Sequence, residues 1–113
     1  MDSKKIATTI INQLRAGTDG YNSGIVLMMC WGYRQPTIVR KTTEYGFDQY
    51  GVSFKVSGLF LKGTVEIVLD QGADMYNIRF LNLRGREVKA VEGVFFDDLT
   101  RIVDMVVEKE GFK

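Results

Sequence analysis

The chain has 113 residues, of which 45% are hydrophobic and 26% are charged, and its formal net charge is +1. This composition is typical of one globular domain spanning 1–113 and excludes a disordered or strongly basic protein. The chain has no histidine and one cysteine, Cys30, so the side chains that most often transfer protons or bind transition metals near neutral pH are missing. We therefore predict a non-enzymatic protein with no catalytic residues, no cofactor and no metal.

The longest apolar run, residues 25–31, is much shorter than the ~20 residues that span a bilayer. Polar side chains interrupt residues 6–14, which is not typical of a signal peptide. One cysteine cannot form a disulfide within its own chain. These observations predict a cytoplasmic protein without a membrane partner.

Residues 2–16 are predicted to form the first helix. Their large apolar side chains recur every four residues, which is typical of one buried helix face: Ile6, Ile10 and Leu14. Gly17 follows as a helix-stop signal. The polar, glycine-containing segment 17–24 then predicts a connector.

The apolar run 25–31 stands between Gly24 and Gly32 and has the length of a strand. We interpret it as a strand covered on both faces, because such strands are continuously apolar. Cys30 and Trp31 would then lie in the core, where apolar neighbours favour an unreactive thiol.

Residues 33–50 are the least regular part of the sequence and predict a strand followed by a mobile loop. From residue 52 onward, apolar and polar side chains alternate as in strands with one buried face. Strands are expected at 52–57, 65–69, 76–80 and 86–92, with turns at Lys62-Gly63, 70–74 and Arg84-Gly85. Short turns favour an antiparallel meander of five or six strands.

Residues 95–109 predict a last helix with Phe95, Leu99 and Val103 on its apolar side and Asp104 on its polar side. The predicted fold class is therefore α+β. An N-terminal and a C-terminal helix are expected to pack on one face of the meander.

Basic and aromatic side chains gather on the expected outer face of the sheet and its flanking loops. Cations that follow a phosphate backbone beside rings that stack on bases are typical of single-strand nucleic-acid binding. The candidate residues are Tyr33, Arg34, Arg40, Lys41, Lys55, Arg79, Arg84 and Arg86. Acidic residues in the same segments and the near-neutral total charge argue against this reading.

Tyr45, Phe47 and Tyr50 form an aromatic group in the expected loop. Such rings are enriched at protein interfaces, although they can also fold back over an open sheet edge. A protein partner or a second copy, bound through a sheet edge or the last helix, is the leading hypothesis. Nucleic-acid binding is the second.

Carboxylate-dependent catalysis is the third hypothesis, since glycoside hydrolysis needs only two carboxylates. Nothing in the spacing of Glu87, Glu92, Asp97 and Asp98 marks a cleft, and helix capping and solvated surface explain them.

Four strings spread along the chain carry a family resemblance: residues 29–32, 63–69, 76–80 and 91–99. With them the sequence resembles small uncharacterised proteins of about 100 residues from phages and mobile elements of gut bacteria. The resemblance implies a shared fold and an accessory role in a phage or mobile element. It implies no activity and no catalytic residue.

Overall fold

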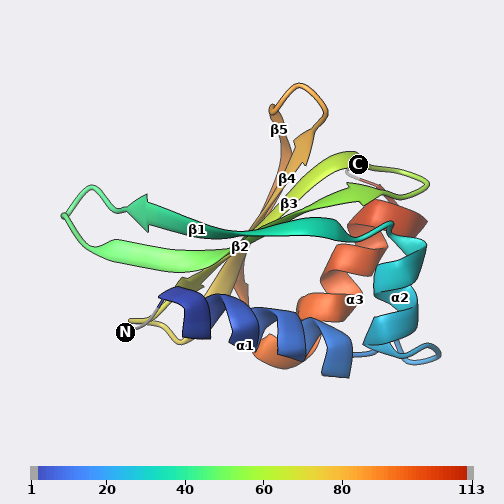
Figure 1. Cartoon of the computed structure of the whole chain (residues 1–113), viewed down its shortest axis with the longest axis horizontal. Coiled ribbons are helices and arrows are strands. Elements are labelled where there is room, and N and C mark those ends of the chain that lie inside the picture. Colours follow the sequence, from blue (N-terminus) through green and yellow to red (C-terminus); the bar gives the residue numbers. More distant parts are fainter. Residues whose placement is uncertain (1–2, 112–113) are drawn as a thin grey trace.

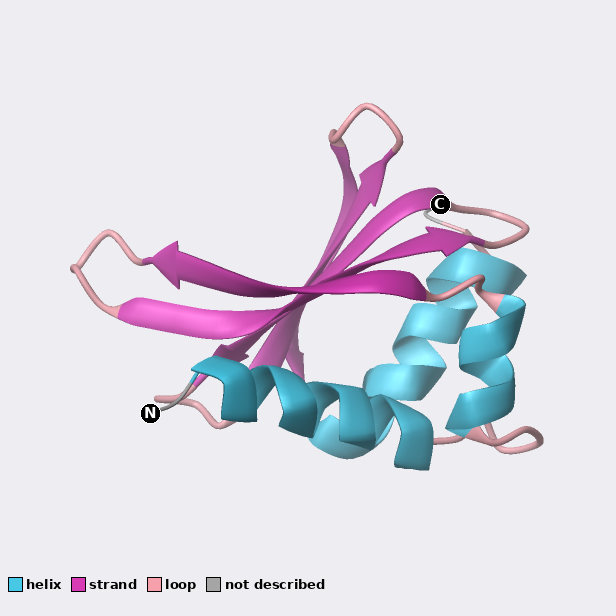
Figure 2. Cartoon of the chain, in the orientation of Figure 1, coloured by secondary structure: helices cyan, strands magenta, loops and turns pink. Residues whose placement is uncertain are grey.

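The computed structural model describes residues 3–111. One antiparallel sheet has its strands in the order β1–β2–β3–β4–β5, and the helices cover one of its faces (Figures 1 and 2). The strands are β1 (Arg34–Thr42), β2 (Asp48–Ser57), β3 (Lys62–Asp70), β4 (Met75–Asn82) and β5 (Glu87–Val94). The predicted α+β meander is therefore confirmed, with five strands.

The helices are α1 (Ser3–Ala16), α2 (Gly24–Cys30) and α3 (Leu99–Asp104). A 3-10 turn, η1 (Phe96–Asp98), precedes α3, and a π-helical turn, η2 (Met105–Lys109), continues it. The predicted first helix is confirmed from Ser3, whereas Asp2 lies outside the described residues.

Strand alternation gives the sheet one apolar face. Val52, Ile67 and Ile78 lie opposite one another across β2, β3 and β4, and all three are buried. The intervening residues, such as Glu66 and Arg79, point to the other face. The alternation predicted from residue 52 is thus confirmed. The predicted turn at Lys62-Gly63 is wrong, because the Gly58 N–H donates to the Leu61 carbonyl and closes the turn earlier, at 58–61.

The helices complete one hydrophobic core against the apolar face of the sheet. The predicted face of α1 is buried, and so are four apolar side chains of the last helix: Leu99, Val103, Val106 and Val107. Trp31 is fully buried, as predicted, and its ring stacks on Phe54 with 6.5 Å between centroids.

The predicted strand at 25–31 is wrong, because Gly24–Cys30 forms helix α2. The Ser23 hydroxyl accepts a hydrogen bond from the Val26 N–H, and the Ser23 carbonyl accepts one from Leu27. Periodicity cannot distinguish a strand from a helix in a short run that is apolar throughout, so packing against α1 determines that this segment is a helix. One side of α2 remains in solvent: Ile25, Val26, Met29 and Cys30. The prediction that Cys30 is a core thiol is therefore also wrong.

Residues 33–50 contain more regular structure than the predicted strand and loop. Strand β1 ends at Thr42, and residues 43–47 form a turn in which the Thr43 N–H donates to the Phe47 carbonyl over 2.7 Å. Strand β2 then begins at Asp48, four residues before the alternation in the sequence.

Two side chains of the last helix do not lie where the helical pattern predicts. Phe95 is 58% exposed, because it precedes the 3-10 turn and lies outside the helix. Asp104, predicted to face solvent, is 1% exposed. The helix therefore carries a carboxylate into the core.

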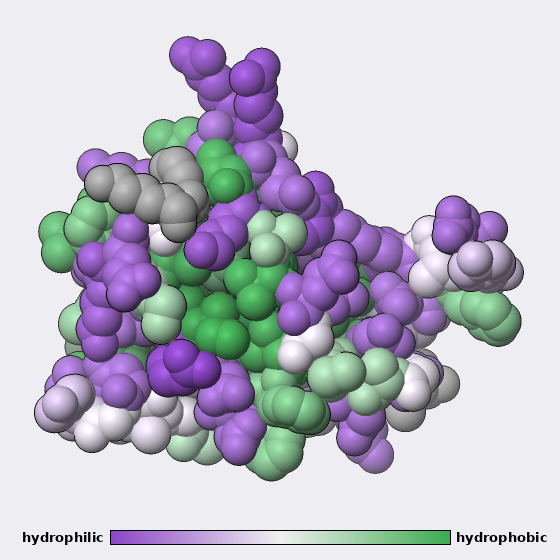
Figure 3. All heavy atoms as spheres, turned by 180° about the vertical axis from the view of Figure 1, so that it is seen from behind, coloured by the Kyte–Doolittle hydropathy of each residue, from purple (hydrophilic) through white to green (hydrophobic). Residues whose placement is uncertain are grey.

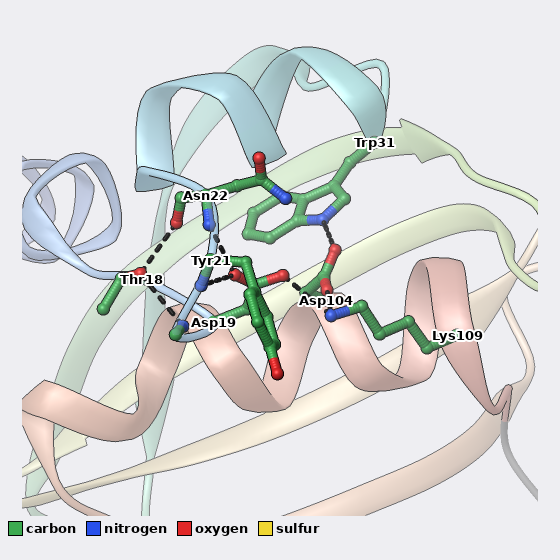
Figure 4. A network of polar contacts seen from close by, with 8 residues as sticks. Thr18, Asp19, Tyr21, Asn22, Trp31, Asp104 and Lys109 are labelled. Atoms are coloured by element: carbon green, nitrogen blue, oxygen red, sulfur yellow. Dashed lines mark hydrogen bonds and ion pairs between the residues drawn. The ribbon is translucent and has the colours of Figure 1, made fainter.

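A polar network surrounds Asp104 and connects the last helix to the segment between α1 and α2 (Figure 4). The Trp31 indole N–H donates to Asp104 Oδ1 over 2.9 Å. Asp104 Oδ2 forms an ion pair with Lys109 Nζ at 3.1 Å, without an aligned hydrogen bond. Lys109 also donates to Asp19 Oδ2 over 2.7 Å, and Asp19 Oδ1 accepts the N–H groups of Tyr21 and Asn22. These contacts connect segments of the chain that are far apart in sequence, so we infer that the network stabilises the fold.

The network makes stability depend on pH. The Lys109 ammonium and the N–H groups of Asn22 and Tyr21 hold the pKa of the Asp19 carboxyl well below its usual range. Such a group stabilises the fold above its unfolded pKa of about 3.9, and this contribution is lost as the pH falls. We therefore expect the melting temperature to fall less on acidification in an Asp19→Asn variant than in the unmodified protein.

Circular dichroism melting curves at about pH 6 and about pH 3 measure this difference. An Asp97→Asn variant is the control, because this exposed carboxyl lies outside the network, and it should follow the unmodified protein. Parallel curves for Asp19→Asn and the unmodified protein would contradict the assignment.

Candidate functional site

The predicted interface aromatics do not stay together in the structure. Tyr45 and Phe47 lie at the tip of the β1–β2 hairpin and are 80% and 71% exposed. Tyr50 is half-buried and packs against the core. Two of the three predicted interface residues therefore form an exposed pair. The third packs against the core from β2, which differs from both the predicted interface and the predicted cover over an open sheet edge.

The hairpin tip is held in one shape by local hydrogen bonds. The Thr43 hydroxyl accepts the Phe47 N–H over 3.1 Å, and the Gly46 N–H donates to the Thr43 carbonyl. Gly46 has a φ of +83°, which favours glycine at this corner. The hairpin extends beyond the helices (Figure 1). Figure 3 shows apolar and polar side chains mixed at its tip, whereas the tip of the β4–β5 hairpin is hydrophilic.

A pocket of about 580 Å³ lies between this tip and the turn from β3 to β4. The residues that line it, which we call the hairpin-end pocket, are Thr43, Glu44, Tyr45, Phe47, Asp48, Gln49, Asp70, Gln71 and Gly72. Three of these nine residues carry carboxylates, two carry aromatic rings, and none is Lys or Arg. Rings beside carboxylates attract cations, because the ring faces and the carboxylates are both negative.

Two carboxylates of the hairpin-end pocket are positioned by their neighbours. Asp48 Oδ1 accepts the Thr42 hydroxyl over 2.9 Å, and Arg40 Nε lies 3.7 Å from Asp48 Oδ2. Asp70 Oδ1 accepts the N–H groups of Gly72 and Ala73, which shapes the turn. The sequence predicts only a turn at 70–74, because no local signal places this segment beside the β1–β2 hairpin.

The eight predicted nucleic-acid residues do not form one surface. Tyr33 lies on the face of the sheet that the helices cover, because its ring centroid is 4.9 Å from that of the core residue Phe54. Its predicted place on the outer face is therefore wrong. Arg40 pairs with Tyr50, a core-facing position of β2, and therefore also points to the helix side. The ring contact of Tyr33 and the strand register of Arg40 therefore correct the prediction that both residues lie on an outer platform.

Two more of these residues are held by carboxylates on the outer face. Lys41 Nζ lies 2.6 Å from Glu66 Oε1, and Arg79 Nη1 lies 3.3 Å from the same oxygen. Arg79 Nε also donates to Glu87 Oε1 over 2.6 Å. The partnership with Glu87 and Glu66 raises the pKa of the Arg79 guanidinium. The middle of the outer face is thus compensated in charge and is poorly suited to phosphate.

The remaining four residues lie at the opposite end of the sheet from the hairpin-end pocket. Arg34 and Lys55 face each other across β1 and β2, and Arg84 and Arg86 flank the tip of the β4–β5 hairpin. The sheet therefore has a basic end and an acidic, aromatic end, which the net charge of +1 conceals.

Comparisons with protein-family models, with curated proteins and with solved structures find no match. Within residues 3–111, no helix has the length and apolar character needed to cross a bilayer.

Proposed function

We propose that this chain is a non-enzymatic binding protein that holds a basic segment of a protein partner in the hairpin-end pocket. The observation that carries the proposal is a pocket of about 580 Å³ in which exposed rings and carboxylates occur without a cation among the lining residues. Its size falls within the range of ligand-binding clefts. A Lys or Arg side chain supplies the charge that the carboxylates attract and that a ring face accepts.

The two rings are suited to an interface because they are exposed on a turn that is already ordered. Little conformational entropy is then lost when Tyr45 and Phe47 become buried against a partner. Aromatic side chains with these properties often dominate the binding energy of an interface. The carboxylates of the same pocket repel phosphate, which favours a protein over a nucleic acid at this site. Action in a phage or mobile element stays a prediction.

A peptide titration tests the proposal. The probe is a fluorescein-labelled decapeptide of alternating lysine and serine, followed by anisotropy and by amide NMR shifts. We expect saturable shifts at residues 43–49 and 70–72. The double variant Tyr45→Ala, Phe47→Ala should bind at least about tenfold more weakly, because each ring is expected to act as an anchor.

The matched control removes two other exposed rings, with Phe95→Ala and Phe96→Ala, which are 58% and 61% exposed and precede α3. This control should bind the peptide as the unmodified protein does. The proposal fails if the peptide leaves the amides of 43–49 unshifted, or if both double variants lose the same affinity.

A further inference from the structure

A second pocket, of about 340 Å³, lies at the basic end of the sheet and is independent of the hairpin-end pocket. Its lining comes from β1, β2, β3 and the β4–β5 hairpin: Arg34, Gln35, Lys55, Gly63, Thr64, Asn82, Leu83 and Gly85. We call it the basic-end pocket. Two of its eight residues are cations, three are neutral hydrogen-bonding side chains, and none is acidic.

Both cations of the basic-end pocket are held in place by neutral groups. Arg34 Nη1 donates to the Gly32 carbonyl over 3.0 Å and to the Ser57 hydroxyl over 3.1 Å. Lys55 Nζ donates to the Thr64 hydroxyl over 3.2 Å. Arg has five N–H donors and Lys has three, so donors remain on both side chains. Neutral partners orient the two charges but do not compensate them.

Other cations extend the positive charge around the pocket. Lys62 pairs with Ser57 in the sheet register, and Arg84 and Arg86 stand on either side of Gly85 in the β4–β5 turn. The backbone N–H groups of Arg84 and Arg86 each donate to Asn82 Oδ1. The side-chain NH₂ group of Asn82 can therefore donate to a ligand. The nearest carboxylate along this row of the sheet, Glu87, is already bonded to Arg79.

The backbone beside Arg34 is strained. Gln35 has a φ of +54°, which is uncommon for a residue other than glycine, and the register of β1 with β2 shifts between Arg34 and Thr37. Bulges of this kind often redirect side chains beside binding sites. Here the irregularity lies where Arg34 and Gln35 enter the lining of the basic-end pocket.

We propose that the basic-end pocket binds a phosphate group. Arg34 and Lys55 supply the charge, and Thr64, Gln35 and Asn82 supply neutral hydrogen-bonding groups around the phosphate oxygens. The lining contains no aromatic ring, so recognition concerns the phosphate and involves no base stacking. The phosphate can belong to a small phosphorylated molecule or to the backbone of a single-stranded nucleic acid, and the experiment separates these sources.

The experiment titrates the full chain with three probes: inorganic pyrophosphate, ADP and a fluorescein-labelled dT12 oligonucleotide at low salt. We expect saturable amide shifts at Arg34, Lys55, Thr64 and Gly85. The double variant Arg34→Gln, Lys55→Gln should weaken binding by at least about tenfold, and for single-stranded dT12 it should lower the magnitude of the slope of log affinity against log salt by about 1.4. Binding of pyrophosphate and ADP without dT12 identifies a small ligand, and preference for dT12 identifies a nucleic acid.

The control variant Arg40→Gln, Arg101→Gln also removes two positive charges, but from sites where each cation already pairs with a surface carboxylate. It should bind all three probes as the unmodified protein does. Equal losses in both double variants would overturn the proposal, because they indicate attraction by total charge. Absence of saturable shifts with all three probes would overturn it as well, and so would binding of a decaglutamate peptide without a response to any phosphate probe.

Discussion

Replacing Gly24 with alanine should lower the free energy of unfolding by about 3 kcal/mol or more, at the upper end of the cost of overpacking. Gly24 is buried where α2 meets the end of α1, and its N–H donates to the Gly17 carbonyl over 2.7 Å. A Cβ added there would lie 1.9 Å from the Leu14 carbonyl oxygen and 2.8 Å from that of Arg15. Both obstacles are backbone atoms, so relief requires the two helices to separate.

Urea unfolding followed by circular dichroism measures this effect. Gly72→Ala is the matched control, because the nearest atom to its added Cβ is 3.5 Å away, an ordinary van der Waals contact. We expect the control to change stability by less than about 1 kcal/mol. A Gly24→Ala variant as stable as Gly72→Ala would show that the helices tolerate a wider spacing than the structure gives them.

Replacing Asp104 with alanine should cost about 2–4 kcal/mol of unfolding free energy. The change leaves the buried indole N–H of Trp31 without its acceptor and removes one of the two carboxylates that hold Lys109. The cost stays below that of a fully buried ion pair, because Lys109 is half exposed and keeps Asp19.

Asp104→Asn separates the two contributions, since its amide oxygen can still accept from Trp31 while the ion pair with Lys109 is lost. We expect it to be less destabilising than Asp104→Ala. Asp98→Ala is the surface control: its 3.3 Å pair with Arg101 is exposed and contributes less than about 1 kcal/mol. If Asp104→Ala unfolded at the same urea concentration as Asp98→Ala, the network would have no structural importance.

Charge at the two ends of the sheet could not be inferred from the sequence totals. The two groups of charge become visible only when the strands are placed in register. Four carboxylates then lie near the turns at one end of the sheet: Glu44, Asp48, Asp70 and Asp74. Five cations lie near the turns at the other end: Arg34, Lys55, Lys62, Arg84 and Arg86. Antiparallel strands bring alternate turns to the same end of a sheet, so residues far apart in sequence meet there. The predicted basic platform combines four of these cations, Arg34, Lys55, Arg84 and Arg86, with Lys41 and Arg79, whose charges the structure compensates with carboxylates.

Local patterns were sufficient for the elements with a clear period. The alternation through β2, β3 and β4 and the four-residue spacing in α1 each predicted the buried face, because burial of one side of a regular element imposes its period on the sequence. Exposure of Tyr45 and Phe47 was one of two alternatives that the sequence left open. Asp70 was missed, since no local signal indicates that the β3–β4 turn closes a pocket with the β1–β2 hairpin.

The sequence by itself determined the α+β class, the antiparallel connection of the strands from residue 52 onward and the lack of histidine side chains, because all three depend on composition or on local periodicity. Tertiary structure alone decided that 25–31 is a helix, that Asp104 is buried and that opposite charges gather at opposite ends of the sheet. An apolar run without a period is compatible with a helix or a strand. A carboxylate can be buried in the core only where a hydrogen-bond donor such as the Trp31 N–H lies next to it. Such outcomes depend on contacts between residues that are distant in the chain.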